Sequence, residues 1–590
     1  MQRSGRIGFR TGFACVIFPL LVTAGMSLRS LPAARAGGLS NPDSYMRLVR
    51  LRDMLESGTA LFTVDRDGSG QGALLHWSHL IDSLLCLLAL PFSLFLGPHE
   101  ALHAAALLFG PLNIAAVGFA VAWTAAPFSG GKGLYLVLGA ILPALSPAII
   151  SYGLPGVVHH HAAIVLVAVV SWGLAARLIT GLSAPGAALS LGAWAGLGVW
   201  LTPETLPLTM MAFGALGLAW AVYPARDDIP RAIAQGGVSF WVVVTLALLA
   251  DPPAAGMGAA EIDRLSVLFA ALALAIALTG AGAWGAHGLC PHRGARLTVA
   301  LLIGTGCASV WAFLFRETLF QPSLGLDADQ WHAFFDPISE MHPVTDLMQG
   351  LHFTLTGALA LLIAGFLAVR RRCLFLGYIM MCAIAALVCG WSHVRFAAYP
   401  EAAGAIALPI TLAILGAATA ARHEIVQSFA RVAVILLFVQ VPYLGQMPLL
   451  AGSAHAAPAA MPRPCRPADA AALLGAHPGA VVLTDINDTP ELLYRTGIRT
   501  VASLYHRNTA AFLRMRAAWR TAPSETVPPE IGAAGITLVL GCTGGERTPM
   551  VGDLERVTLY DQARAGKPPP WLRKIAENPE SGHVLYTVAR

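Results

Sequence analysis

Charged residues are scarce in this sequence. Only 12% of its 590 residues are Asp, Glu, Lys or Arg, whereas soluble domains carry about 25%. Hydrophobic residues make up 56%, and the mean hydropathy is +0.64. Such a composition excludes an ordinary soluble globular protein, so most of the chain must be solvated by lipid.

Other patterns are missing as well. No internal repeat of about 20 to 50 residues is evident, which argues against solenoids and propellers. A net charge of +5 is too small to indicate a nucleic-acid partner. The nine cysteines show no C-x-x-C spacing, and most lie in or beside apolar runs, as is typical of core packing. Cys465 and Cys542 lie in the polar C-terminal part and can pair if that part is outside the cytoplasm.

Long apolar runs are abundant. The first, at about 11–27, follows Arg3, Arg6 and Arg10 and is either a first transmembrane helix or the core of a cleaved signal peptide within residues 1–36. The later runs have roughly the 17 to 25 residues needed to cross about 30 Å of hydrocarbon. We expect spans near 101–124, 132–150, 160–180, 185–203, 206–223, 233–250, 262–285, 297–315, 347–369, 373–391, 396–420 and 430–451.

Basic residues set the orientation of these spans. The positive-inside rule requires them in alternate loops, and they occur there as Lys132, Arg177, Arg226, Arg231, Arg293, Arg296, Arg370 to Arg372 and Arg422. The pattern holds only if the apolar run 77–97 is a re-entrant or surface-lying helix. The prediction is therefore about 13 crossings, with external loops at 28–100 and 316–346.

The C-terminal part has a different composition. After a Pro-rich linker, short strand-like runs alternate with helical stretches, at 480–484, 499–503 and 535–541. The predicted fold class is a polytopic α-helical membrane protein with a soluble α/β domain. Residues 1–452 would form the transmembrane domain and residues 453–590 the external domain. We expect a multi-pass protein of the inner (plasma) membrane whose C-terminal domain is periplasmic.

A short polar stretch, Pro155 to His161, separates two apolar runs. Ionisable groups beside hydrocarbon are costly and usually face a cavity. Neutral imidazole binds zinc, manganese or iron and acts as a general base near neutral pH. His159 and His161 are the expected pair, because alternate residues of an extended segment face the same side. The alternative is an interfacial polar cluster that caps the next helix.

Three further polar residues lie on the same predicted side of the membrane. Asp43 begins an amphipathic helix, where a carboxylate also suits the helix dipole. Glu340 lies in the long loop 316–346, and long loops are often functional, although solvated surface glutamates are common. Arg395 is at the external mouth of a span, where it either recognises phosphate or snorkels to the interface.

These residues resemble the motifs of the catalytic subunit of oligosaccharyltransferases, within the GT-C class of glycosyltransferases. Asp43, in Pro-Asp-Ser-Tyr-Met-Arg-Leu, is similar to the first acidic motif of that family, and Gly-Val-Val-His-His-His at 156–161 resembles the second. Ile-Ser-Glu-Met-His-Pro at 338–343 is similar to the external-loop motif. Arg395 resembles the arginine that contacts donor phosphate in the family. The resemblance covers about residues 1 to 450.

The sequence departs from that family in two places. The family presents an aspartate where this chain has His159, so a metal ion there must tolerate imidazole. The C-terminal domain contains no Trp-Trp-Asp-Tyr-Gly, the signature that reads the Asn-x-Ser/Thr sequon. The domain instead has Tyr-His-Arg-Asn at 505–508, which faces an acceptor, faces the membrane domain, or caps a helix.

The resemblance implies transfer of a sugar or oligosaccharide from a polyprenyl phosphate or diphosphate to a protein or glycan acceptor on the periplasmic face. Membrane lipid is the other expected partner. The implied roles are catalysis by Asp43 and Glu340, donor phosphate binding by Arg395 and His160, and coordination of a divalent Mn, Mg or Zn ion by Asp43, His159, His161 and Glu340.

Two other functions fit the composition. One is a transporter or flippase of lipid-linked substrates, and the other is a non-catalytic envelope protein that binds polyprenyl lipids. Transporters usually show paired halves and polar residues at the bilayer midplane. Here the polar residues gather at one face and no halves repeat, which favours the transferase.

Overall fold

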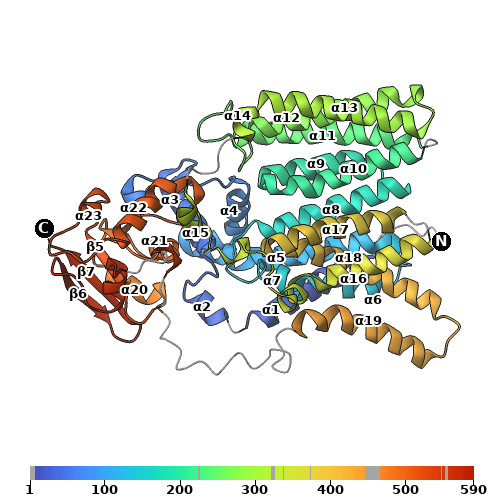
Figure 1. The fold of residues 1–590 in the computed structure, drawn as a ribbon. Helices are drawn as coiled ribbons and strands as arrows, with labels where there is room; N and C mark the ends of the chain where they lie inside the picture. The colour runs from blue at the N-terminus through green and yellow to red at the C-terminus, as the bar shows by residue number, and fades with distance from the viewer. Residues whose placement is uncertain are drawn as a thin grey trace.

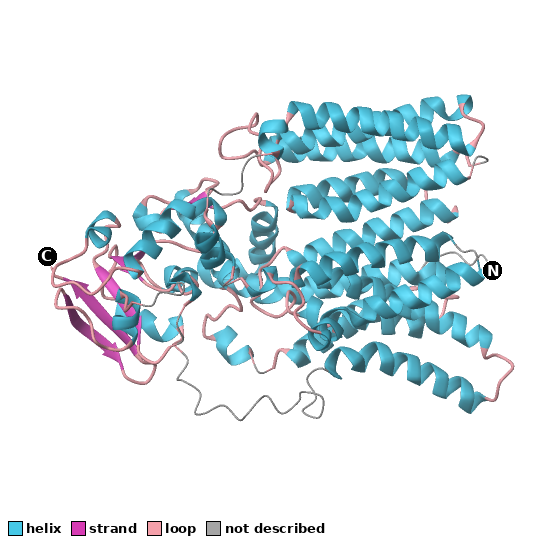
Figure 2. Cartoon of the chain, in the orientation of Figure 1, coloured by secondary structure: helices cyan, strands magenta, loops and turns pink. Residues whose placement is uncertain are grey.

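The computed structural model describes residues 7–28, 30–223, 226–320, 326–336, 338–371, 374–444, 465–545, 548–551 and 556–589. Long helices lie side by side in a bundle, and the C-terminal part, drawn in orange and red, lies at one end of it (Figure 1). The strands are at that same end of the molecule (Figure 2). Arg3, Arg6, Arg372 and the predicted boundary at 452/453 lie outside the described residues.

Apolar helices build the bundle, and each predicted run overlaps one. They are α1 (Phe9–Met26), α5 (Pro98–Ala125), α6 (Gly133–Leu145), α8 (His161–Thr180), α9 (Ala187–Leu201), α10 (Leu206–Val222), α11 (Asp228–Ala250), α12 (Val267–Ala286), α13 (Arg293–Leu314), α16 (Leu347–Arg371), α17 (Leu374–Ser392), α18 (Ala398–Ala418) and α19 (Glu424–Leu444). Among the described residues, eight helical segments have the length and hydropathy of a membrane span. The expected number of about 13 crossings therefore stays a prediction.

Helix α1 is packed into this bundle. It contacts α5 and α6, and Cys15 and Pro19 on it are buried. A Cβ atom at Gly118 of α5 would lie 2.9 Å from Cγ of Pro19, and small residues of this kind allow helix backbones in membranes to approach closely. Helix α1 therefore lies against α5 and α6, and both alternatives for this segment stay predictions.

The apolar run 77–97 forms the short helix α4 (Leu80–Ser93). Its 14 residues extend only about 21 Å at 1.5 Å per residue, less than the about 30 Å of hydrocarbon. Asp82 of α4 forms buried ion pairs with Arg47, at 2.7 Å, and with Arg50. Both arginines lie on α3 (Pro42–Ser57), so α4 is fixed to the polar helix α3 near the C-terminal part (Figure 1).

The C-terminal part contains a five-stranded mixed sheet in the order β4-β3-β5-β7-β6. β3 pairs in parallel with β4 and β5, whereas β7 runs antiparallel to β5 and β6. The strands are β3 (Val481–Leu483), β4 (Arg499–Thr500), β5 (Leu538–Cys542), β6 (Leu572–Asn578) and β7 (His583–Val588). The three strand-like runs seen in the sequence contain or overlap β3, β4 and β5. β6 escaped notice because it is a largely exposed strand at the sheet edge with charged side chains.

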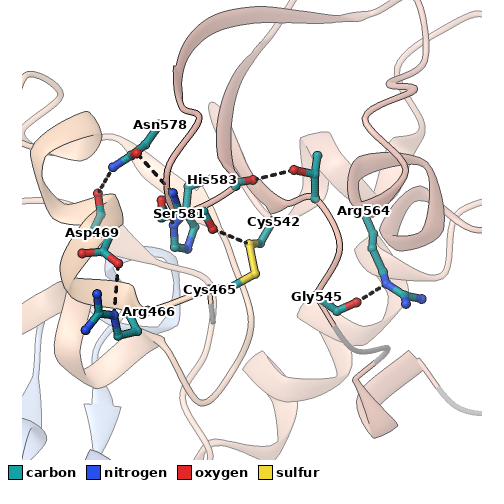
Figure 3. The surroundings of a disulfide bond; sticks show 11 residues. Cys465, Arg466, Asp469, Cys542, Gly545, Arg564, Asn578, Ser581 and His583 are labelled. Carbon is teal, nitrogen blue, oxygen red and sulfur yellow. Dashed lines mark hydrogen bonds and ion pairs between the residues drawn. A yellow bond between two sulfur atoms is a disulfide. The ribbon is translucent and has the colours of Figure 1, made fainter. Parts of the chain in front are cut away.

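A disulfide bond joins Cys465 to Cys542 at the end of β5 (Figure 3). The two Cα atoms are 6.1 Å apart, and the bond links positions 77 residues apart in the sequence. Nearby, the Asn578 side chain donates to the backbone carbonyl of Asp469, at 3.3 Å. The two cysteines that the sequence set apart from the apolar ones are therefore partners.

Candidate active site

Short polar contacts hold the start of α3 against the histidine segment. Asn41 caps α3 by accepting a hydrogen bond from the backbone N–H of Ser44, at 2.8 Å. The Ser44 hydroxyl in turn accepts from the backbone N–H of Val158, at 2.7 Å. Gly156 has a φ of 81°, a backbone angle that favours glycine, and this allows the chain to turn toward α3. The side chain of Asp43 is thereby placed beside the histidines.

Asp43 lies in the first turn of α3 and is bonded on both carboxylate oxygens. Nε2 of His159 lies 2.8 Å from Oδ2, and the hydroxyl of Tyr505 donates to Oδ1 at 3.1 Å. Burial raises the pKa of Asp43, but the hydrogen bonds and charge of His159 and the bond from Tyr505 outweigh it, so the pKa lies below its usual value. The carboxylate is therefore ionised at neutral pH.

The three histidine rings form one close cluster in which each ring contacts the other two. The ring centroids of His159 and His161 are 4.2 Å apart, those of His159 and His160 are 4.5 Å apart, and the Nδ1 atoms of His159 and His161 are in contact. The expectation of an extended segment is wrong, because His160 has helical angles (φ −74°, ψ −17°) where the chain turns into α8. Burial and the adjacent His159 and His161 lower the pKa of His160 well below its usual value, so its ring is neutral.

Glu340 meets the histidines through Tyr152. It lies in the short helix η5 (Ser339–Met341), and its Oε2 accepts from the Tyr152 hydroxyl at 3.2 Å. The Tyr152 ring stacks on His161 with centroids 4.5 Å apart. Burial and the neighbouring carboxylate raise the pKa of Tyr152 well above its usual value, so the hydroxyl remains a donor. Tyr152 therefore lies between Glu340 and the group formed by Asp43 and the three histidines.

Arg395 pairs with Glu204, a residue that the sequence analysis did not select. Arg395 lies in η6 (Val394–Ala397), and Glu204 lies in η3 (Pro203–Thr205) between α9 and α10. Nε of Arg395 and Oε2 of Glu204 are buried, and neither has a hydrogen-bond partner in the described part of the chain. The sequence does contain a signal for Glu204: it is an acidic residue between two apolar runs, in Leu-Thr-Pro-Glu-Thr.

One cavity of about 870 Å³ connects these groups. Apolar side chains of the bundle, including Leu268, Leu272 and Trp311, form another part of its wall. The six predicted site residues all line it: Asp43, His159, His160, His161, Glu340 and Arg395. The cavity therefore offers a polar end and an apolar side to the same ligand.

A second polar group lines the same cavity, formed by His76, Asp263 and His506. Nε2 of His506 lies 2.5 Å from Oδ2 of Asp263, and the rings of His76 and His506 are 4.5 Å apart. Burial and the neighbouring His506 lower the pKa of His76 to about 3, so its ring is neutral. Neither His76 nor Asp263 belongs to a recognisable sequence motif, so the sequence predicts neither as a site residue.

The segment 505–508 faces the membrane part of the chain, one of the three alternatives that the sequence left open. Tyr505 bonds to Asp43, and Nε of Arg507 donates to Asp263 at 2.8 Å. Asn508 begins α22 (Thr509–Trp519) and lies against Asp67. Tyr505 and His506 also line the cavity, so the C-terminal part supplies one of its walls.

These features define a polytopic membrane protein in which polar residues from distant segments meet at a cavity beside a C-terminal α/β part. Solved structures share this fold. The archaeal oligosaccharyltransferase AglB from Archaeoglobus fulgidus, in complex with an inhibitory peptide and a dolichol-phosphate, aligns with a TM-score of 0.67 and 13% identity, over 90% of this chain and 69% of that chain.

Two further structures of the Archaeoglobus fulgidus oligosaccharyltransferase align over similar lengths. The complex with Zn and sulfate gives a TM-score of 0.63 and 12% identity, over 89% of this chain and 67% of that chain. The enzyme tethered to an acceptor peptide containing the NVT sequon gives a TM-score of 0.65 and 13% identity, over 90% of this chain and 69% of that chain. No family model and no curated protein matches the sequence. At these identities the likeness shows the fold, and the predicted GT-C fold of oligosaccharyltransferase type is confirmed.

Proposed function

We propose that this protein is a membrane glycosyltransferase that moves a sugar or oligosaccharide from a polyprenyl phosphate or diphosphate to an acceptor on the periplasmic face of the inner membrane. The observation that carries the proposal is the convergence of Asp43, His159, His161, Glu340 and Arg395 on one cavity. One structural neighbour holds a dolichol-phosphate and another an acceptor peptide, so this fold accommodates both kinds of substrate.

Arg395 would bind the donor phosphate. Its Nε has no hydrogen-bond partner among the described residues, and the present ion-pair partner of its guanidinium, Glu204, is a carboxylate. A phosphate group offers more oxygens and accepts bidentate hydrogen bonds from guanidinium, so the donor can take the place of Glu204. His160 lines the cavity and would donate a ring N–H to the same phosphate. The polyprenyl tail would lie along the apolar wall that contains Leu268.

Asp43 would act on the acceptor. Its ionised carboxylate can take the proton from the acceptor nucleophile as that atom attacks the anomeric carbon. The bond between that carbon and the phosphate oxygen breaks, and the phosphate leaves with the electron pair while Arg395 balances its charge. His159 and Tyr505 hold the Asp43 carboxylate in position from both sides. The acceptor is proposed to be a protein or a glycan.

The residues present fit a divalent metal ion. Asp43 contacts His159, His159 contacts His161, and Nε2 of His161 is buried with no partner among the described residues. Two imidazoles beside a carboxylate favour Zn²⁺ or Mn²⁺ over Mg²⁺. Asp43, His159 and His161 would hold the ion. Glu340, the fourth residue that the sequence assigns to this set, is separated from them by Tyr152 and would have to move to reach the ion. When bound, such an ion supplies Lewis-acid stabilisation of the leaving phosphate.

The disulfide bond between Cys465 and Cys542 supports the external location of the C-terminal part, because disulfides persist outside the cytoplasm. Tyr505 of that part bonds directly to Asp43. The cavity would therefore open on the external side, where a polyprenyl-linked donor and a secreted acceptor can meet.

Substitution of the two proposed catalytic carboxylates tests the proposal. Asp43→Asn and Glu340→Gln variants should each lose transfer from a radiolabelled polyprenyl-linked sugar by about 100-fold or more, while they keep the fold. Asp346→Asn, at an exposed carboxylate in the same external loop as Glu340, is the matched control and should retain activity. Full activity in both folded catalytic variants would sink the proposal.

A further inference from the structure

A second set of metal-ligand side chains lies in the cavity and shares no residue with the group of Asp43 and the three histidines. We propose that His76, Asp263 and His506 form a second divalent-metal site, of the kind that binds Zn²⁺, and that it fastens the C-terminal part to two loops of the membrane part. The proposed metal site does not depend on the proposed transfer reaction. It would stand even if this protein had another function.

Three segments that are distant in the sequence supply the ligands. His76 lies between β2 (Ala73–Leu74) and α4, Asp263 lies between α11 and α12, and His506 begins η7 (His506–Asn508). Each offers one ligand atom, and these atoms lie within 4.8 Å of one another. Ligand atoms around one tetrahedral Zn²⁺ are roughly 3.3 Å apart, as bond lengths near 2.0 Å require. A small contraction of the group would therefore enclose an ion.

His76 gives the clearest indication that this group binds a metal ion. Its Nδ1 is buried and has no hydrogen-bond partner among the described residues, although buried polar atoms normally have one. Its ring lies against that of His506, with centroids 4.5 Å apart, so two imidazoles stand side by side. A metal ion in this group would supply the partner that the described residues do not.

Outer contacts hold the ligands in place, as is usual around metal sites. Arg507 pairs with Asp263 and, at 2.5 Å, with Glu261. Asp251 anchors the same loop by accepting from Arg264 at 2.9 Å. The carboxylates of Asp263 and Glu261 and the guanidinium of Arg507 together carry a net negative charge, which suits a cation.

An ion-pair clamp without metal is the competing explanation. In that case His506 simply donates to Asp263, Arg507 completes the pair, and His76 only packs against His506. This clamp accounts for three of the four residues but leaves Nδ1 of His76 with no partner in the described part of the chain. Two imidazoles and one carboxylate are instead side chains that together commonly bind zinc.

Zinc content separates the two explanations. Purified full-length protein in nanodiscs would be stripped with chelator, loaded with Zn²⁺ alone, desalted and analysed for metal per chain. A double variant, His76→Phe with His506→Gln, should lose a Zn²⁺ ion that a His159→Ala, His161→Ala double variant retains. Phe preserves the ring contact at position 76, and His99→Ala, at a half-exposed histidine outside the cavity, is the control.

Binding of Co²⁺ adds a direct spectroscopic readout, because its visible bands report nitrogen ligands. Those bands should persist in the His159→Ala, His161→Ala variant and disappear when His76 and His506 are also changed. Equal metal content in wild type and the His76→Phe, His506→Gln variant would overturn the proposal. If that double variant does not fold, His76→Phe alone should weaken Zn²⁺ affinity about tenfold or more, and unchanged affinity would equally contradict the site.

Discussion

The hydroxyl of Tyr505 donates a 3.1 Å hydrogen bond to Oδ1 of Asp43, across a sequence separation of 462 residues. Asp43 lies in the first turn of α3, whereas Tyr505 follows β4 of the C-terminal sheet. The bond therefore places the C-terminal part directly on the candidate catalytic carboxylate. We therefore expect the C-terminal part to shape and orient the candidate site.

Tyr505→Phe should slow transfer without unfolding the protein. The substitution keeps the ring and removes only the hydroxyl, and a hydrogen bond to a charged group contributes about 1.5 to 3 kcal/mol. We expect kcat to fall about 10-fold to 100-fold, measured with radiolabelled donor. Tyr586→Phe, at a buried tyrosine of β7, is the control and should leave kcat unchanged. Equal activity of Tyr505→Phe and wild type would show that the bond does not orient Asp43.

Glu204→Gln should tighten donor binding. The present partner of Arg395 competes with phosphate, and the amide keeps the shape of the side chain while it removes the negative charge. The KM for the donor should fall about threefold to tenfold, whereas Arg395→Gln should raise it about tenfold or more. Asp336→Asn, an exposed external-loop carboxylate, serves as the control. A higher donor KM in Glu204→Gln would mean that the pair only supports the structure.

Asp67 should make stability depend on pH. It is fully buried, and burial raises its pKa from 3.8 to about 6 although Ser503, Gly68 and Thr500 donate to it. The folded protein therefore binds more protons than the unfolded chain between these values, and the free energy of unfolding falls as pH rises through about 6. Two pKa units correspond to about 3 kcal/mol.

Thermal midpoints at pH 5 and pH 7 measure this effect against an Asp67→Asn variant, which has no titrating group at the position. Wild type should gain stability relative to the variant on going from pH 7 to pH 5. The difference isolates Asp67, because all other groups titrate alike in the two proteins. Parallel pH profiles would contradict the raised pKa.

Loss of the disulfide bond should destabilise the C-terminal part. Cys465 and Cys542 are 77 residues apart, and closing a loop of that size stabilises a folded state by about 4 kcal/mol in the chain-entropy description. A Cys465→Ser, Cys542→Ser variant should show a lower midpoint for this part by calorimetry. Cys307→Ser, at an unpaired and partly exposed cysteine of the bundle, is the control and should not. A wild-type protein purified from cells with both thiols free would argue against an external location.

The sequence predicts much of the bundle because hydropathy acts locally. Each expected span from residue 101 onward overlaps a helix, and the short run at 77–97 forms only α4. His159 and Asp43 can likewise be selected from sequence, because ionisable groups beside apolar runs are costly and therefore informative. β3 and β5 appear as well, because their residues form short continuous apolar runs. β4 contains only Arg499 and Thr500, and the sequence predicts it as part of the longer run 499–503.

The partners of these residues cannot be predicted in the same way. His76 and Asp263 lie in loops of ordinary polarity, and only the packing of helices and the docking of the C-terminal part bring them to the cavity. Glu204 stands out in the sequence as an acidic residue between two apolar runs, but its pairing with Arg395 depends on the fold. The separation of Glu340 from the histidines by Tyr152 also depends on ring packing that no spacing rule describes.

The most direct test of the proposed function is consumption of a labelled donor by the purified wild-type protein. Full-length protein reconstituted in liposomes would be supplied with radiolabelled polyprenyl diphosphate sugars and a periplasmic extract as the source of acceptors. The proposed transfer requires label to leave the lipid fraction and to appear on an acceptor, with loss of this transfer in Asp43→Asn. Label that crosses the bilayer while it remains attached to polyprenyl lipid would identify a flippase, and label that stays in place on the lipid would identify a non-catalytic binding protein.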